Sequence, residues 1–338
     1  MTLQANQTAG LVNAHHHLYS ALARGMPAPP RRPQTFNDIL ELVWWRLDRG
    51  LDLELVRASA RLGAVEALEA GTTTIVDHHS SPNAIDGSLD VIADACAEVG
   101  VRVRCCYEVT DRNGAAGAKA GLAENERFLR ERGASAGYVG AHACSTLSNE
   151  TLDAVCGLAE DLAVGVHIHV AEAESDAAAG VRLAGRARDS WLLGHCVHLD
   201  RELPGTVLHN PRSNLNNSVG YGRPARFPRV ALGTDGIGSD LLEEAALAFA
   251  LHRADDRDAS PDVAWSWLQQ SADDRVTWSY EPMVPWHVAY TPGIRPVRVE
   301  VGGEVVLDER GPTRIDADEV RAHAREAAVR LFARMEDL

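Results

Sequence analysis

The sequence Asn13-Ala14-His15-His16-His17-Leu18 follows directly on the apolar residues Gly10-Leu11-Val12. Alternate residues of a strand project to the same face, so His15 and His17 would extend side by side from the end of a strand over 10–15. Two imidazoles in this arrangement supply half of the ligands of a divalent metal site. The alternative is that the histidines remain from a tag or a processing segment. We reject it because the run is short and leads into an apolar segment, and because later histidines occupy matching positions.

Two later clusters repeat this pattern. His167-Ile168-His169-Val170-Ala171-Glu172 ends the apolar run 163–166, and Thr234-Asp235-Gly236 ends the run 230–233. Five further apolar runs that end in polar residues cover 72–76, 101–106, 138–141, 192–194 and 206–208. Helical periodicity is found over 36–49, 52–70, 87–99, 116–132, 149–162, 176–186 and 241–253. Short apolar strands that alternate with helices are typical of a parallel (β/α)8 barrel, whose active site lies at the carboxyl ends of the strands.

The two ends of the chain depart from this pattern. Residues 1–9 are polar and predicted to be irregular, and 260–295 are rich in tryptophan and proline without clear periodicity. Residues 297–307 read as a β-hairpin with a Gly-Gly turn, and a final helix is expected over 316–336. The sequence therefore predicts an α/β fold with a TIM-like barrel over 1–255 and a compacted C-terminal segment over 256–338.

Composition excludes several classes of partner. The 338 residues carry a formal net charge of −15 and have a pI near 5.4, which disfavours binding to nucleic acid. No apolar stretch reaches transmembrane length, and the N-terminus lacks the layout of a secretory signal, so no membrane partner is expected. The six cysteines show no C-x-x-C spacing, and we interpret them as reduced thiols of a cytoplasmic protein.

The motifs resemble the amidohydrolase superfamily, in particular its chlorohydrolase and cytosine-deaminase-like branch, and within that branch the SsnA-type aminohydrolases. The resemblance covers nearly all of 10–255 and resumes weakly over 294–335. The segments that carry it are 10–18, 43–49, 71–79, 106–114, 140–150, 167–172, 194–199, 208–217 and 233–240. Most relatives have an N-terminal segment that forms a small sandwich with C-terminal strands. Because only fourteen residues precede His15, that half of the sandwich is expected to be absent here.

The resemblance also implies roles for individual residues. The metal ligands would be His15, His17, His169 and Asp235. Glu172 would correspond to a proton-shuttling glutamate, His195 to a histidine that polarises the substrate, and His142 to a position that lines the substrate pocket. We add His79 and Asn210 as candidate substrate contacts, although both could simply belong to hydrogen-bonded turns. Asp235 would also act in catalysis by accepting a hydrogen bond or proton from the attacking water.

One metal ion is expected rather than two. Relatives with two metals use a carboxylated lysine on the fourth strand, but the only lysine here is Lys119, outside any strand end. Nitrogen and oxygen ligands suit zinc, iron and manganese, and we expect zinc. The implied reaction is attack of metal-bound hydroxide on an sp2 carbon, with Glu172 as general acid and base.

Several other residues have an open or structural interpretation. His16 alternates away from the metal and is expected to pack or to lie in a loop. His167 is interpreted as a supporting or helix-facing residue, and His78 is left unassigned. Trp44 and Trp45 are predicted to belong to the core rather than to a ligand cage.

Three functions agree with these features. The first is a deaminase that acts on a small nitrogen heterocycle or a guanidine-type substrate. The second is a ring-opening cyclic amidohydrolase, which would release no ammonia. The third is an inactive scaffold relative, against which the retention of all four ligands and Glu172 argues. The hairpin at 297–307 would lack its customary partners, so we expect the tryptophan-rich segment, the last helix or another subunit to cover it, and we predict a homo-oligomer, most simply a dimer.

Overall fold

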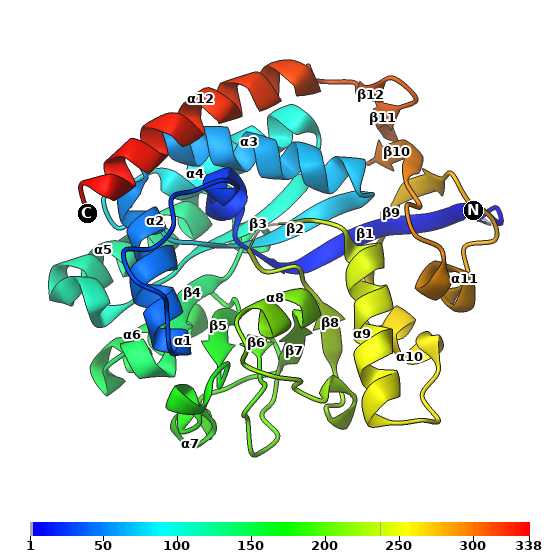
Figure 1. The fold of residues 1–338 in the computed structure, drawn as a ribbon. Helices are drawn as coiled ribbons and strands as arrows, with labels where there is room; N and C mark the ends of the chain where they lie inside the picture. The colour runs from blue at the N-terminus through cyan, green and yellow to red at the C-terminus, as the bar shows by residue number, and fades with distance from the viewer. Residues whose placement is uncertain (1–2, 237) are drawn as a thin grey trace.

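The computed structural model describes residues 3–236 and 238–338, and its centre is a curled layer of parallel strands (Figure 1). These strands are β1 (Gln7–His16), β2 (Thr72–His79), β3 (Arg102–Tyr107), β4 (Val139–Ala143), β5 (Val166–Val170), β6 (Leu192–His195), β7 (Thr206–His209) and β8 (Val230–Leu232). One hydrogen-bonded sheet contains β1, β2 and β3, and a second contains β4 to β8 in chain order. The predicted mixed α/β fold with a parallel sheet is confirmed.

The two parallel sheets meet at isolated bridges. Cys105 bridges to Gly137 between β3 and the start of β4, and His16 at the end of β1 bridges to Asp235 after β8. A Cβ atom on Gly137 would lie 1.9 Å from the carbonyl oxygen of Cys105, a distance that real Cβ atoms do not adopt. Glycine at this position therefore permits the close approach through which the first sheet continues into the second.

Helices follow each of these strands in the described chain, except that β6 leads to β7 without one. They are α1 (Phe36–Ile39), a π-helical turn η2 (Leu40–Trp44), α2 (Trp45–Gly50), α3 (Leu53–Glu69), α4 (Ser88–Val99), α5 (Gly114–Arg132), α6 (Asn149–Asp161), α7 (Ala179–Leu183), α8 (Pro211–Asn216) and α9 (Leu241–Asp255). Side-chain caps define several starts; for example, Asp52 accepts a hydrogen bond from the backbone of Leu55 at the start of α3. Most predicted ranges agree, but α7 is shorter than the expected 176–186, and α8 was not predicted.

A strand from the tryptophan-rich segment, β9 (Gln269–Trp278), runs antiparallel to β1. Gln7 lies opposite Thr277, so residues 7–9, predicted to be irregular, instead begin β1. The pairing is reinforced by Trp278, which is 2% exposed and donates a hydrogen bond from Nε1 to the Thr8 hydroxyl at 2.9 Å. As a result, β1 extends out of the parallel layer toward the C-terminal strands (Figure 1).

The predicted hairpin is present as β10 (Pro296–Val301) and β11 (Glu304–Asp308), followed by the short strand β12 (Gly311–Pro312). Gly302 and Gly303 form its turn with φ of 58° and 85°, values that favour glycine. β10 pairs with β9, so the tryptophan-rich segment, one of the three expected alternatives, covers this edge. Two short helices, α10 (Pro261–Ser266) and α11 (Pro285–Tyr290), flank β9.

The last helix, α12 (Ala317–Glu336), begins after its N-cap Asp316. It lies across α3 at the top of Figure 1 and also contacts α2. Its buried face consists of the predicted residues Val320, Ala324, Ala327, Leu331 and Met335. Among the described residues, we find no helix whose length and apolar character would allow it to cross a membrane.

Candidate active site

The four predicted metal ligands converge at the carboxyl ends of three strands. His15 and His17 lie at or just after the end of β1, His169 lies on β5, and Asp235 follows β8. The His15 ring centroid lies 4.9 Å from that of His17 and 5.1 Å from that of His169. The Asp235 Oδ1 atom lies 3.1 Å from His15 Nε2 and 3.0 Å from His17 Nε2. The structure thus brings together residues that are far apart in the chain.

The hydrogen bonds behind the two β1 histidines fit a cation between them and Asp235. His17 Nδ1 contacts the backbone carbonyl of His78, which can only accept a hydrogen bond, so the proton of the neutral ring is on Nδ1 and the Nε2 lone pair faces Asp235. His15 Nδ1 lies 2.8 Å from His167 Nε2, and His15 Nε2 is buried without a hydrogen bond within the described chain. Lone pairs that converge on a carboxylate oxygen require a proton or a metal ion between them.

The spacing also suits a divalent metal. Two ligand atoms bound about 2.1 Å from one ion at angles of about 90–110° lie roughly 3.0–3.4 Å apart, as these atoms do. Ligand atoms of His15, His169, His195 and Asp235 all lie within 4.8 Å of one another, and His17 joins this group through its contact with Asp235. The donor set of imidazoles and a carboxylate is that of a catalytic zinc-type site.

Glu172 and His195 face the same group. Glu172 follows β5 by two residues, and its Oε2 lies 3.6 Å from His195 Nε2. His195 Nδ1 lies 2.8 Å from the amide oxygen of Asn214, to which it donates, so that Nε2 is left free toward Glu172. The backbone of His195 and of Asp235 is left-handed, with φ of 66° and 61°. Such strained backbone is characteristic of functional sites, where the surrounding structure holds a side chain in place.

Burial and neighbouring charges perturb the ionisation of these groups. Burial raises the pKa of Glu172 to about 7, against the lowering influence of His195. Burial alone would lower the pKa of His17, but the hydrogen bond and charge of Asp235 outweigh it and raise that pKa to about 9. Burial would raise the pKa of Asp235, but its close contacts with His15 and His17 hold that pKa well below its ordinary value. Glu172 is therefore suited to exchange a proton near neutral pH.

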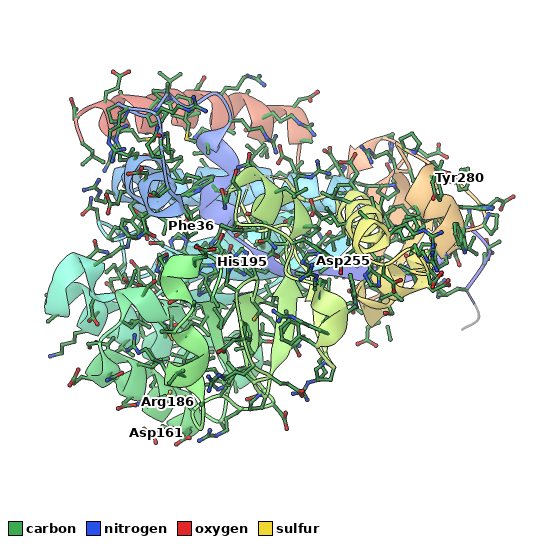
Figure 2. The ribbon with its side chains drawn as sticks, turned by 60° about the horizontal axis from the view of Figure 1, so that its bottom comes forward. Phe36, Asp161, Arg186, His195, Asp255 and Tyr280 are labelled. Carbon is green, nitrogen blue, oxygen red and sulfur yellow. The ribbon has the colours of Figure 1, made fainter. Side chains whose placement is uncertain are left out.

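A cavity of about 280 Å³ opens over this cluster and is close to the lower end of the range typical of ligand pockets. His142, predicted to line a pocket, does so, and its Nδ1 lies 2.8 Å from the Thr146 hydroxyl. His79 and Asn210 are not among the lining residues: His79 is fully buried against Ser81, and Asn210 lies behind His195. Figure 2 shows His195 near the middle of the molecule.

The cavity has an aromatic wall that the sequence did not indicate. Trp44 and Trp45 are partly exposed and line the cavity. The assignment to the core was wrong for Trp45, whereas Trp44 also packs against the buried core. They lie on η2 and α2. Helical periodicity is the same for a side chain that faces the core and for one that faces a cavity. The aromatic lining residues are Tyr19, Phe36, Trp44 and Trp45.

Glu108, which directly follows β3, is the most prominent site residue missed. Its Oε1 lies 3.2 Å from His78 Nδ1 and 3.4 Å from His17 Nδ1. Ligand atoms of Glu108, His17, His78 and His169 form a second group within 4.8 Å of one another. Burial would raise the pKa of Glu108, but the charge and hydrogen bond of His78 hold it below its ordinary value. Its position at a strand end was the signal that could have identified it.

The helix α8 contributes two further residues that were not predicted. The hydroxyl of Ser213 donates a hydrogen bond to Asp235 Oδ2. The side-chain amide of Asn217, at the end of this helix, donates to Glu172 Oε1 at 3.4 Å. Both residues line the cavity, so α8 orients the two carboxylates of the site.

Three other histidines near the site, His16, His167 and His78, make contacts that support the structure. His16 is buried, with Nδ1 2.9 Å from the Thr234 hydroxyl, in agreement with the packing role predicted for it. Of the two interpretations of His167, the supporting one agrees with the structure and the helix-facing one was wrong. Residues two apart on β5 share a face, so His167 lies beneath His169 and supports His15. His78 stacks on His167 with ring centroids 4.4 Å apart.

Comparison with known proteins shows to which family the chain is related. The model of the Amidohydrolase family matches residues 7–270. A 5′-deoxyadenosine deaminase of Methanopyrus kandleri is 32% identical over 286 residues, which are 74% of this chain and 63% of the relative. The chain therefore aligns with less than two thirds of the length of this relative.

Two solved structures share the fold. An adenosine deaminase from Xanthomonas campestris with bound zinc superposes with a TM-score of 0.78 at 22% identity, covering 96% of this chain and 85% of that one. An atrazine chlorohydrolase from Arthrobacter aurescens, complexed with zinc, gives a TM-score of 0.78 at 20% identity, covering 95% and 88%. At these identities the likeness concerns the fold alone.

Proposed function

Since the chain belongs to the amidohydrolase family, we propose that it is a metal-dependent aminohydrolase that removes an amino group from an sp2 carbon of a small nitrogen heterocycle or a guanidine-type substrate. The observation that carries this proposal is the convergence of the His15 and His17 Nε2 atoms on Asp235 beneath a cavity that also exposes Glu172. The deaminase names of related proteins favour amino-group removal over ring opening, and they make 6-aminopurine nucleosides the first candidates.

The cofactor we propose is a single divalent cation, most simply zinc, held by His15, His17, His169 and Asp235. When bound, it would supply Lewis acidity that lowers the pKa of a water molecule. We favour one cation because Lys119, the only lysine, is exposed on α5, away from the strand ends.

The side chains around this position would divide the chemistry between them. Asp235, oriented by Ser213, accepts a proton from the attacking water. Glu172 passes this first proton of the water to a ring nitrogen. The second proton of the water, released as the carbonyl forms, passes through Glu172 to the amino group, which leaves as ammonia. His195, its Nδ1 fixed by Asn214, orients the attacked carbon through Nε2. His142 contacts the substrate from the opposite strand end, whereas His79 and Asn210 act by supporting their neighbours.

The domain organisation, the cellular location and the oligomeric state are also part of the proposal. We propose that the strands and helices up to residue 255 form a (β/α)8 barrel that carries the chemistry, and that 256–338 form a reduced appendage. A cytoplasmic location and a homodimer stay predictions.

Ammonia release tests the function. The zinc-loaded protein is incubated with a panel of amino-substituted purines, pyrimidines and triazines, and released ammonia is compared with loss of substrate. Equal amounts are expected for at least one compound. Glu172→Gln should lower kcat by about 10²–10⁴-fold without loss of metal. Loss of substrate without ammonia would instead indicate ring opening, and no turnover of any compound would contradict the proposal.

A further inference from the structure

The segment that carries Glu172 begins with an unusual backbone conformation. It joins β5 to the 3-10 turn η6 (Glu174–Asp176). Ala171, directly before Glu172, is buried and has a φ of 46°, in the left-handed region that favours glycine. An alanine keeps this conformation only where its surroundings hold it. The direction in which the Glu172 side chain leaves β5 therefore depends on the groups that bind Ala171.

The carboxylate of Asp176 is one of these groups. Its Oδ2 accepts a hydrogen bond from the backbone N–H of Ala171 at 2.9 Å. On the other side, the backbone carbonyl of Ala171 accepts a hydrogen bond from the N–H of His198 at 2.8 Å. Both backbone polar groups of Ala171 are thus bound, and Asp176 closes the segment 171–176 across its own base.

The other carboxylate oxygen of Asp176 binds the neighbouring strand end. Its Oδ1 accepts a hydrogen bond from the backbone N–H of Ser145 at 2.8 Å. Ser145 lies in the 3-10 turn η5 (Cys144–Thr146), which directly follows β4, the strand of His142. β4 and β5 are adjacent in the parallel sheet (Figure 1). Asp176 therefore ties together the two strand ends that carry His142 and Glu172.

The contacts of Asp176 suit it to support its neighbours rather than to bind substrate. It lines the cavity, but it is 7% exposed, and each carboxylate oxygen already accepts a charge-assisted hydrogen bond from the backbone. The carboxylate of Glu172 is held more loosely. Its hydrogen bond from Asn217 is 3.4 Å long, and His195 Nε2 lies 3.6 Å away. The backbone at Ala171 thus contributes much of the orientation of Glu172.

We infer that Asp176 is a positioning residue, which holds Ala171 in its left-handed conformation and thereby aims the Glu172 carboxylate into the cavity. This inference rests on the proposed aminohydrolase function, in which Glu172 transfers protons. A general acid and base must lie within hydrogen-bond distance of the atom that it protonates, and a displacement of about 1 Å can lower the rate about 10²-fold. Loss of the Asp176 carboxylate should therefore act on kcat through Glu172 and leave the proposed metal ligands in place.

Steady-state kinetics of zinc-loaded variants test this dependence, with the panel compound from which the wild type releases most ammonia. Asp176→Ala should lower kcat by at least about tenfold and change KM by less than about threefold, at unchanged zinc content. In the Glu172→Gln background, followed over long incubations, the same substitution should change the residual kcat by less than about threefold. A residue that acts through Glu172 has no further effect once that carboxylate is gone, whereas a merely structural role would lower kcat equally in both backgrounds.

Two further variants separate this role from general effects. Asp111, which follows β3, accepts a hydrogen bond from the backbone N–H of Ser148 at 2.6 Å. Asp111→Ala therefore removes a similar carboxylate from a loop that does not carry Glu172, and it should leave kcat within about threefold of the wild type. If Asp176→Ala does not fold, Asp176→Asn retains one acceptor oxygen and should give a smaller loss of kcat with the same dependence on Glu172.

Amide hydrogen exchange supplies a readout that does not require turnover. Exchange is measured by mass spectrometry on zinc-loaded protein, in peptides that cover 170–176. Asp176→Ala should speed exchange there by at least about tenfold, because the N–H of Ala171 loses its acceptor. Peptides from α12 should exchange as in the wild type, and Asp111→Ala should leave 170–176 unchanged.

Each outcome decides the inference. An unchanged kcat in Asp176→Ala, an equal loss in both backgrounds, or unchanged exchange over 170–176 would overturn it. Ammonia release by the wild type reports separately on the proposed function. Release of ammonia together with unchanged exchange in Asp176→Ala would overturn the inference alone. A wild type that releases no ammonia from any compound would contradict the function and, with it, the catalytic role inferred for Asp176.

Discussion

Arg112→Leu should destabilise the protein in a manner that depends on pH. Arg112 and Asp48 form an ion pair whose side chains are 9% and 1% exposed. Removing one partner of a buried pair leaves an uncompensated charge and costs about 3–5 kcal/mol. At roughly 2–4 °C per kcal/mol, as measured for chains somewhat shorter than this one, the melting temperature should fall by about 6–20 °C.

The pH dependence follows from Asp48. Burial raises its pKa from 3.8 to about 6 even with Arg112 in place. A folded-state pKa above the unfolded value means that stability is lost as pH rises between them, by about 3 kcal/mol for a shift of this size. Without Arg112 the folded-state pKa is higher still. The variant therefore loses additional stability through Asp48 well above pH 6, where the ionisation of this carboxyl is complete in the wild type.

Urea denaturation of the zinc-saturated proteins at pH 5 and pH 8 measures this effect. The deficit of Arg112→Leu relative to the wild type should be clearly larger at pH 8. The double variant Arg112→Leu/Asp48→Asn should recover at least half of it, because no charge is then buried alone. A deficit equal at both pH values, or a double variant as unstable as the single one, would refute this reasoning.

Three further variants address the positioning of the site. Gly233→Ala should weaken metal binding by at least tenfold in a titration with zinc, because the added Cβ would lie 2.7 Å from His15 Cβ and force the backbone before Asp235 away from β1. Ser213→Ala should lower kcat about tenfold, with metal content unchanged, through loss of one charge-assisted hydrogen bond to Asp235. Trp278→Ala should lower the free energy of unfolding by about 3–5 kcal/mol in urea, since this side chain is 2% exposed between β1 and β9; an effect below 1 kcal/mol would contradict the role assigned to that pairing.

The convergence of the predicted ligands could be anticipated because its signal is local. His15, His169 and Asp235 each end an apolar run, and strands that share a direction bring their ends to one edge. Glu108 carries the same signal after β3 and could have been included by the same rule. The face of His167 was also predictable, since it lies two residues from His169 on one strand.

Other features depend on contacts that no local pattern records. Residues 269–278 form a strand because they pair with the start of β1, more than 250 positions away in the chain. Trp45 faces a cavity rather than the core because of how α2 packs against α12, and helical periodicity is the same in both cases. Asp48 and Arg112 meet only in the folded chain. Sequence patterns therefore located the reacting end of the site but not the walls of its cavity.

The central claim is that His15, His17, His169 and Asp235 bind one cation. Crystals grown with zinc and measured on both sides of the zinc absorption edge would locate it directly. The account predicts a single anomalous peak about 2.0–2.2 Å from three imidazole nitrogens and one carboxylate oxygen of these residues. No peak at this position, or a peak held by Glu108 and His78 instead, would contradict it.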